Sequence, residues 1–408
     1  MDSFDLAGLY DPARHEPLTA TPWSEGAARA AIARIVDDSL AAFSPEGLWP
    51  AHPLDDPATP DTRYAMLYMG AGGVILALRW LARLGYLASE RAAFEATIPT
   101  LVARNRAVGE TREDSTASLL IGDAGLLLLQ WDARPDPVLA DRLFAVVEGN
   151  LHHPAQESLW GSPGTLLAAL HMARATGDAR WAELFERGAR ILLHQMIFDF
   201  TLGVWVWRQD LYGKVRCYIG GAHGFAGNVY PVLRGAALLP RQLLDSFTER
   251  AWQTLDVLAL RGGGCANWHA VHDPQPGVAR LPLTQDCHGA PGIVVRLATA
   301  PRTPDWDQML LQAGEMTWRA GPLTKGAGLC HGTAGNGYAL LKLWTRTGDS
   351  LWLDRARAFA MHAIEQVERQ RVEYGQGRHS LWTGDVGVAI YLAACIAGES
   401  DFPTLDRF

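Results

Sequence analysis

The sequence of 408 residues lacks paired cysteines of the kind that stabilise small secreted proteins. It contains no CxxC motif, and the number of its cysteines is odd. Disulfide scaffolds are mostly short chains with an even number of cysteines, so we expect reduced thiols and a cytoplasmic location. Any chemistry of these thiols would then be catalytic or metal-binding. The five cysteines are widely spaced, at Cys217, Cys265, Cys287, Cys330 and Cys395.

Long hydrophobic runs and basic tracts are also missing. The apolar windows 117–131 and 72–87 are interrupted by Asp123 and by two arginines, so neither reaches the roughly 20 residues of a membrane span. The first five residues include two acids, and no apolar segment follows them, which is unlike a secretory signal. The net charge of −8, from 36 basic and 44 acidic residues, argues against binding to the phosphates of nucleic acids.

A recurring glycine motif organises the chain. With 48% hydrophobic and 20% charged residues, the composition is that of a globular protein. Its length alone would suggest two or three domains of about 150 residues each. A GxxG motif, however, occurs seven times at a mean spacing near 52 residues, and each copy opens an apolar run. Such self-similarity is typical of repeat architectures. The first glycines of the copies are Gly70, Gly122, Gly161, Gly224, Gly289, Gly332 and Gly384.

The runs around the glycine motifs predict helical hairpins. Residues 388–394 are apolar on most faces and predict a buried inner helix. Residues 352–371 mix apolar and charged side chains, as in an outer helix with one wet face. We expect each glycine turn to use positive φ and close backbone approach. Seven hairpins predict an all-α, closed (α/α) toroid of one domain over residues 1–408, with an open solenoid as the alternative. Residues 261–285 are expected to be a loop between repeats.

The motif also allows equivalent positions of the seven copies to be compared, because equivalent positions in a ring face the same axial cavity. The residue directly before the first glycine is a histidine in copies four to six: His223, His288 and His331. The residue before that is a cysteine in copies five and six, Cys287 and Cys330. Two cysteines and one histidine form a zinc site with a position left open for catalysis. The alternative is a small buried core residue, which we prefer for the other three cysteines.

These strings resemble the lanthionine synthetase C-like (LanC-like) family over nearly the whole chain. The resemblance implies a seven-hairpin toroid with a central Zn²⁺ held by Cys287, Cys330 and His331. It also implies that a thiol adds to dehydroalanine or dehydrobutyrine and forms a lanthionine-type thioether. The strings that carry it are GGAHGFAG at 220–227, CHGAPG at 287–292, GLCHGTAGN at 328–336, GDAG at 122–125 and Phe402-Pro403.

The resemblance implies roles for four more residues. His223 corresponds to the acid/base histidine of the family, and Glu157 stands where many cyclases carry aspartate, so both are candidates for proton transfer. The alternatives are a core histidine for His223 and a solvated loop acid for Glu157. His288 replaces a frequent tyrosine and is expected to donate a hydrogen bond near the metal ligands. Lys325 is expected to hold a carboxylate of glutathione or a peptide backbone, and its alternative is an ordinary surface lysine.

Two sources of thiol are known within the family. Bacterial cyclases use a cysteine of the same peptide, and the eukaryotic branch, which His288, Glu157 and Lys325 resemble, uses glutathione. The expected partners are therefore a dehydrated peptide or protein, with glutathione and a lanthipeptide dehydratase as further candidates.

One departure from the family pattern concerns the residue before the first zinc cysteine, which is usually tryptophan and is Asp286 here. An acid there would either raise the pKa of a zinc-bound thiol or point away from it. Two other functions are alternatives: a non-catalytic zinc- or thiol-binding scaffold, and a glycoside hydrolase, which needs a pair of flanking carboxylates. The acids at the inner ends of the glycine turns form no clear pair in the sequence; they are Asp123, Glu157, Asp286 and Asp385.

Overall fold

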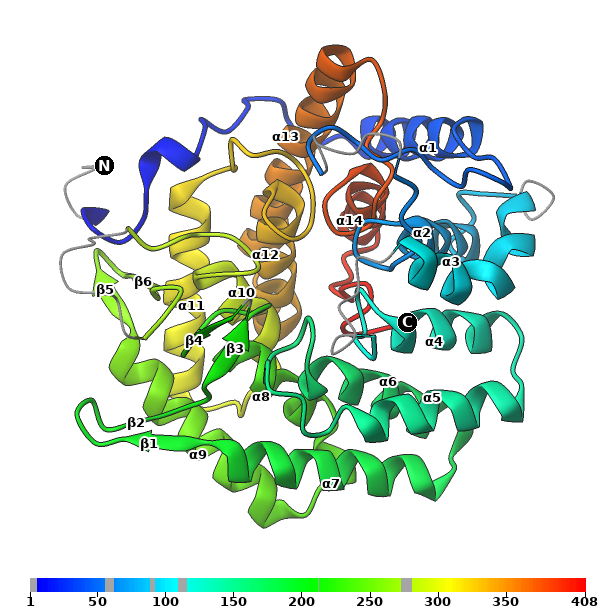
Figure 1. Cartoon of the computed structure of the whole chain (residues 1–408). Coiled ribbons are helices and arrows are strands. Elements are labelled where there is room, and N and C mark those ends of the chain that lie inside the picture. The colour runs from blue at the N-terminus through cyan, green and yellow to red at the C-terminus, as the bar shows by residue number, and fades with distance from the viewer. Residues whose placement is uncertain (1–5, 56–61, 89–91, 109–115, 212, 273–280) are drawn as a thin grey trace.

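Two concentric sets of helices build the molecule (Figure 1). The computed structural model describes residues 6–55, 62–88, 92–108, 116–211, 213–272 and 281–408. Within these residues, fourteen α-helices alternate along the chain between an outer and an inner set, which confirms the predicted all-α toroid. The inner helices are α2 (Ala71–Arg83), α4 (Asp123–Ala133), α6 (Ser162–Thr176), α8 (Phe225–Arg234), α10 (Ala290–Leu297), α12 (Thr333–Thr347) and α14 (Asp385–Ala397). The outer helices are α1 (Glu25–Ala41), α3 (Leu101–Val108), α5 (Pro137–Gly149), α7 (Ala179–Gln195), α9 (Arg241–Leu258), α11 (Pro304–Ala320) and α13 (Ser350–Tyr374).

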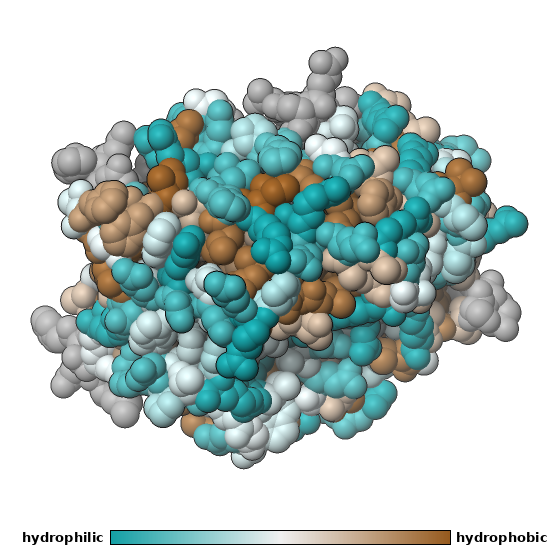
Figure 2. Space-filling model, turned by 90° about the horizontal axis from the view of Figure 1, so that it is seen from below, coloured by the Kyte–Doolittle hydropathy of each residue, from teal (hydrophilic) through white to brown (hydrophobic). Residues whose placement is uncertain are grey.

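The inner and outer helices differ in their pattern of burial. Every residue of α14 from Asp385 to Cys395 is buried, as expected for a helix surrounded by other helices. In contrast, α7 buries Trp181, Leu184 and Phe185 at helical spacing and exposes charged residues on its other face. On the face shown in Figure 2, hydrophobic patches are accordingly interrupted by hydrophilic side chains. Among the described residues, no helix is both long and apolar enough to cross a membrane.

Close backbone approach, and not positive φ, explains the glycines of the repeat. Of the seven first glycines, which all precede an inner helix, Gly289 alone has a positive φ, at 98°, so the expectation of positive φ at every turn is wrong. The last glycine of each motif packs against the carbonyl oxygen six residues earlier. A Cβ atom there would lie 1.8–2.4 Å from that oxygen, a distance that no side chain tolerates.

The segment that precedes each glycine motif folds back over the start of the inner helix and caps it. None of these seven helices has a side-chain cap, although the first N–H groups of a helix need acceptors. In several copies a carbonyl oxygen seven residues earlier takes this place. The Phe225 N–H donates to the Tyr218 oxygen at 2.9 Å, and the Thr333 N–H donates to the Gly326 oxygen at 2.9 Å.

A closed belt of hydrogen bonds surrounds the axis at the glycine-turn end. Its members stand two residues before the first glycine of each copy, and we call them the axial belt: Tyr68, Leu120, Leu159, Ala222, Cys287, Cys330 and Trp382. Backbone bonds join five neighbouring pairs at N···O distances of 2.8–3.3 Å. The remaining two links run through the Ser118 hydroxyl, which donates to the Leu159 oxygen, and the Ser158 N–H, which donates to the Ala222 oxygen. The belt shows that equivalent positions meet at one axis.

The two ends of the chain close the ring. Trp382 of the last copy donates its N–H to the Tyr68 oxygen of the first copy at 3.0 Å, and α14 packs against α2. The outer partner of α14 is α1, so the last inner helix is completed by the first outer helix. The toroid is therefore closed, and the open solenoid is wrong.

Three short hairpins interrupt the helical pattern on the side of α8 to α11 (Figure 1). The hairpins were not predicted from the sequence, and one lies in the segment 261–285, for which a loop was expected. Residues 273–280 of that segment lie outside the described residues. The hairpins are β1 (Ile197–Asp199) with β2 (Val204–Val206), β3 (Gln209–Leu211) with β4 (Lys214–Arg216), and β5 (Leu260–Gly262) with β6 (Cys265–Asn267).

Candidate metal centre and site chamber

The fold brings together the three predicted metal ligands. The ligand atoms of Cys287, Cys330 and His331 all lie within 4.8 Å of one another. The two cysteines are neighbours in the axial belt, where the Cys287 N–H donates to the Cys330 oxygen at 3.1 Å. Both thiols are buried, and the imidazole is half-buried. Each ligand therefore sits on backbone that the belt and the glycine turns hold in place.

The surroundings of the two thiols favour one thiolate. The hydrogen bond between the thiols lowers the pKa of Cys330 and raises that of Cys287. The Gln285 amide donates to the Cys287 sulfur at 2.8 Å, and the Tyr68 hydroxyl bonds to Cys330. Two thiols and one imidazole at this separation match the donor set of zinc sites that keep one position open, so the residues fit the ion that the sequence implied.

Beside this cluster, Glu157 holds His223. The carboxylate lies 2.8 Å from the His223 Nδ1, is fully buried, and also accepts the N–H groups of Leu159 and Trp160. Glu157 is therefore not a solvated loop acid. Burial lowers the pKa of His223, but the hydrogen bond and the charge of Glu157 outweigh it and raise this pKa above its usual value.

His288 is a second histidine of opposite character. Burial, reinforced by the positive charge on His223, lowers the pKa of His288 to about 4, so it is neutral at pH 7. The two rings lie 5.9 Å apart between centroids, and Tyr218 lies 6.1 Å from His288. The His288 Nδ1 is buried without a partner among the described residues. One histidine of the pair thus favours a proton, and the other remains neutral.

Asp286 pairs with a buried arginine. Its two carboxylate oxygens accept the Arg296 Nη1 and Nη2 at 2.7 and 2.8 Å, and both side chains are almost fully buried. The acid therefore does not point out to solvent, and its charge is balanced inside the ring. Arg296 belongs to the apolar inner helix α10 and was not among the site residues predicted from the sequence.

An apolar chamber adjoins the cluster, and we call it the site chamber. Tyr68 and Trp382 of the axial belt form one wall, with nearly parallel rings 6.0 Å apart. Leucines form half of the remaining lining, and polar side chains contribute a smaller part of it. The lining includes Leu119, Leu120, Leu159, Leu167, Leu405, His223, Arg296 and Cys330.

The other candidates lie elsewhere. Lys325 is exposed on the surface and is not part of the chamber lining. Asp123 pairs with Arg106. Asp385 accepts the Arg378 N–H at 2.9 Å, and burial raises its pKa to about 7. With Glu157 and Asp286 already engaged, these acids form no facing pair.

The remaining cysteines lie outside the cluster. Cys265 and Cys395 are buried and Cys217 is half-buried, and none of the five forms a disulfide in the described structure. Burial raises the pKa of Cys395 to about 12, as in an inert core thiol.

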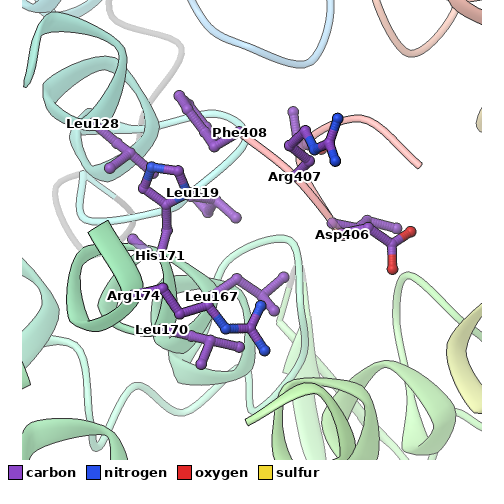
Figure 3. A pocket seen from close by; sticks show the side chains of 12 residues that line it. Leu119, Leu128, Leu167, Leu170, His171, Arg174, Asp406, Arg407 and Phe408 are labelled. Atoms are coloured by element: carbon purple, nitrogen blue, oxygen red, sulfur yellow. The ribbon is translucent and has the colours of Figure 1, made fainter. Parts of the chain in front are cut away.

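A second cavity shares Leu119, Leu167 and Leu405 with the site chamber. Figure 3 shows it between α6, which carries His171 and Arg174, and the carboxy-terminal segment. No cysteine lines it. Of these two cavities, only the site chamber borders one of the candidate metal ligands, Cys330.

Comparison with known proteins gives one family. Residues 61–406 match the family described as lanthionine synthetase C-like protein. The chain is 30% identical to glutathione S-transferase LANCL1 of Danio rerio over 227 residues, which are 55% of this chain and 53% of that protein. It is 38% identical to LanC-like protein GCL1 of Arabidopsis thaliana over 194 residues, 45% of this chain and 42% of that protein. The chain thus spans about half the length of these relatives or less.

A solved structure supports the fold. The chain superposes on nisin cyclase with a TM-score of 0.63 and 16% identity, over 90% of this chain and 94% of that one. At this identity the likeness bears on the helical toroid alone.

Proposed function

Since the chain belongs to the lanthionine synthetase C-like family, we propose that it catalyses zinc-dependent addition of a thiol to dehydroalanine or dehydrobutyrine, forming a lanthionine-type thioether. The observation that carries the proposal is the convergence of Cys287, Cys330 and His331 next to the His223–Glu157 pair. A Lewis acid and an acid/base group side by side are what this addition requires.

The metal ligands hold the ion and leave room for the substrate. Cys287, Cys330 and His331 would bind Zn²⁺, which when bound lowers the pKa of a substrate thiol. The chamber wall of Tyr68 and Trp382 then excludes water from the reacting groups.

The chain's own residues move the proton. The Glu157 carboxylate accepts the His223 Nδ1–H, which leaves Nε2 for proton transfer. In its neutral form His223 takes the proton of the incoming thiol at Nε2, and the charged imidazolium is stabilised by Glu157. The thiolate sulfur bonds to the β-carbon, the π electrons move to the α-carbon and its carbonyl, and His223 returns the proton to the α-carbon. His288 stays neutral and adds no second charge.

The substrates are a dehydrated peptide or protein and a thiol. One relative carries the name glutathione S-transferase and a structural neighbour the name cyclase, which supports glutathione and a peptide cysteine, respectively. We propose a lanthipeptide dehydratase as the source of the dehydro residue. We propose that the reaction takes place in the cytoplasm, since none of the five cysteines is paired in the described structure. Lys325, at the surface, stays a prediction as a contact to glutathione or peptide.

The first prediction tests this function directly. The purified protein should contain about one zinc ion per chain and convert a dehydroalanine peptide to a thioether, with an internal cysteine or with glutathione, as measured by mass spectrometry. Cys330→Ala should lose the zinc and the activity because two ligands cannot hold the ion. Cys395→Ala, a buried cysteine of α14 outside the cluster, is the control and should keep both.

The outcomes separate the alternatives. Zinc without thioether formation would favour the non-catalytic zinc- or thiol-binding scaffold. Absence of zinc from the wild-type protein would contradict both functions.

A further inference from the structure

We propose that Arg296 contacts the substrate and stabilises the negative charge that develops on the carbonyl oxygen of the dehydro residue. The inference deepens the proposed function and rests on it. It concerns a residue on an inner helix, outside the metal ligands and outside the His223–Glu157 pair.

Arg296 lines the chamber in which the reacting atoms would meet. It lines the site chamber together with Cys330 and His223. Its guanidinium carbon also lies close to the backbone of Gly221, two residues before His223: a Cβ atom built on that glycine would be 3.3 Å from it. Arg296 therefore shares the chamber with Cys330, a candidate metal ligand, and with His223, the candidate proton donor. Among the described residues that line the chamber, it is the one arginine or lysine.

Asp286 fixes the orientation of the Arg296 guanidinium group. The fork of two hydrogen bonds at 2.7 and 2.8 Å uses two of the five N–H donors that an arginine offers. Asp286, which carries this carboxylate, directly precedes Cys287 in the chain. The ion pair therefore joins α10 to the segment that carries the first candidate metal ligand. Phe402 covers the guanidinium, with its ring centroid 5.7 Å from the Arg296 Cζ atom. The group is thus held in advance of the reaction, which is the condition for effective electrostatic stabilisation.

The charge balance of the pair suits an enolate. Before the reaction the substrate carbonyl is neutral, and so is the Asp286–Arg296 pair taken as a whole. When the sulfur bonds to the β-carbon, the electron pair of the double bond moves onto the α-carbon and the carbonyl oxygen. An N–H of Arg296 then faces a partial negative charge in an apolar surrounding, where such a bond is stronger than in water. The charge disappears when His223 protonates the α-carbon.

A ligand that imitates this intermediate tests the contact without catalysis. In 3-mercaptopropionate a carboxylate oxygen stands at the same distance from sulfur, counted in bonds, as the enolate oxygen. The zinc-loaded protein should bind 3-mercaptopropionate about tenfold or more tightly than 1-propanethiol in calorimetric titrations, because a charge-assisted hydrogen bond contributes this much. No such preference in the wild-type protein would overturn the proposal.

Variants must remove both partners, because a single substitution would leave a buried charge unpaired. Asp286→Asn with Arg296→Gln keeps a polar pair, and Asp286→Leu with Arg296→Met makes the pair apolar. Each double variant that retains zinc and a cooperative thermal transition should bind the two ligands with affinities within about threefold of each other. A preference retained in either variant would contradict the contact.

Kinetics add a second readout. With the dehydroalanine peptide, the double variants should lose about a hundredfold in kcat while KM changes little, because the charge exists in the transition state and not in the bound substrate. Asp55→Asn with Arg378→Gln, another buried forked pair, is the matched control and should keep kcat. If the wild-type protein shows the ligand preference but forms no thioether, the proposed function fails and the Arg296 contact stands. If it forms thioether and the double variants keep kcat within about threefold, the contact fails and the function stands.

Discussion

At the scale of single residues, the chemistry of the site is set by which partner each titratable group meets. Glu157 and Asp286 are both fully buried acids, yet one holds an imidazole and the other a guanidinium. His223 and His288 lie 5.9 Å apart, and their pKa values move in opposite directions because the carboxylate reaches only the first. Neighbouring residues of the same type therefore have different roles.

The second prediction concerns this carboxylate. Glu157→Gln removes the charge that raises the pKa of His223, so burial prevails and that pKa falls. His223 must be neutral to take the proton of the thiol, so the rise in activity from acid pH should begin at a lower pH, and kcat should drop by about a hundredfold because Glu157 no longer stabilises the imidazolium. The pH dependence of thioether formation measures both. Glu148→Gln, which removes a surface acid paired with Arg187, should leave the profile unchanged, and an unchanged profile in Glu157→Gln would contradict the role given to that residue.

The third prediction concerns Asp385, whose pKa burial raises to about 7. Its contribution to folding stability is fully present below its unfolded pKa and is lost as the pH rises through 7. Asp385→Asn keeps an oxygen for the Arg378 N–H and carries no charge. The variant should therefore gain stability over the wild type as the pH is raised from 4 to 8, by a few kcal/mol since each pKa unit corresponds to about 1.4 kcal/mol.

Denaturant unfolding at the two pH values checks this prediction. The control is Asp123→Asn, at the equivalent position of the second copy, because Asp123 is paired with Arg106. That variant should lose stability at pH 8. A loss of stability at pH 8 in Asp385→Asn as well would show that the Asp385 carboxylate is stabilising when ionised.

Some of these residues follow from the sequence and some do not. Cys287 and Cys330 share one repeat position, His331 stands at the next one, and all three carry metal-binding atoms, so pattern and chemistry agree. Tyr68 and Trp382 share the same position, but aromatic rings are ordinary core residues and gave no chemical signal. Arg296 had a signal, since a charged residue in the apolar run 293–298 needs a buried partner. The partner, Asp286, is ten residues away, and helical or turn spacing alone does not pair the two.

At the scale of elements, the backbone of the glycine turns holds the site residues in place at the start of the inner helices. Each turn folds the preceding segment over the first turn of an inner helix, and its glycine leaves space for a carbonyl oxygen. The helices, their order and their inner or outer position could be predicted because apolar periodicity determines them. The three hairpins could not, because runs of three residues are too short for a period to be seen.

The fourth prediction tests the contact at a glycine turn. In Gly125→Ala the new Cβ would lie 2.1 Å from the Leu119 oxygen, and the backbone of the turn must move, at a cost of about 3 kcal/mol or more. Gly149→Ala, at the end of α5 with open space around it, should be neutral or stabilising by up to about 1 kcal/mol. Equilibrium unfolding in guanidinium chloride compares them, and equal effects would contradict steric exclusion as the reason for the glycine.

At the scale of the whole molecule, the first and last helices depend on each other. Because α1 is the outer partner of α14, the last inner helix is covered only when both ends of the chain are folded. The closed toroid predicted from the sequence requires packing across the two ends, but the repeat pattern pairs each outer helix with the inner helix that follows it and did not predict that α1 covers α14. We propose on this basis that residues 1–408 unfold as one domain.

The fifth prediction follows from this dependence. Ile32→Ala removes a fully buried side chain of α1 and should cost about 2–5 kcal/mol. Circular dichroism, tryptophan fluorescence and zinc release should all shift to the same lower midpoint, because the ring opens as a whole. Val372→Ala, on an exposed position of α13, should shift none of them. A midpoint of zinc release that stays in place in Ile32→Ala would show that the amino-terminal helix folds separately from the site.

The axial belt also has a consequence for protein engineering. Seven backbone positions present their side chains to one axis, and the chemistry occupies a few of them. A substitution at Leu120 or Leu159 would deliver a new functional group to the same interior from the opposite side, on backbone whose geometry is already fixed by its neighbours. The equivalent positions of the ring can therefore carry different functional groups. A second reactive centre can be designed by placing the Cys and His ligand pattern on another pair of neighbouring repeats, and no new scaffold is needed.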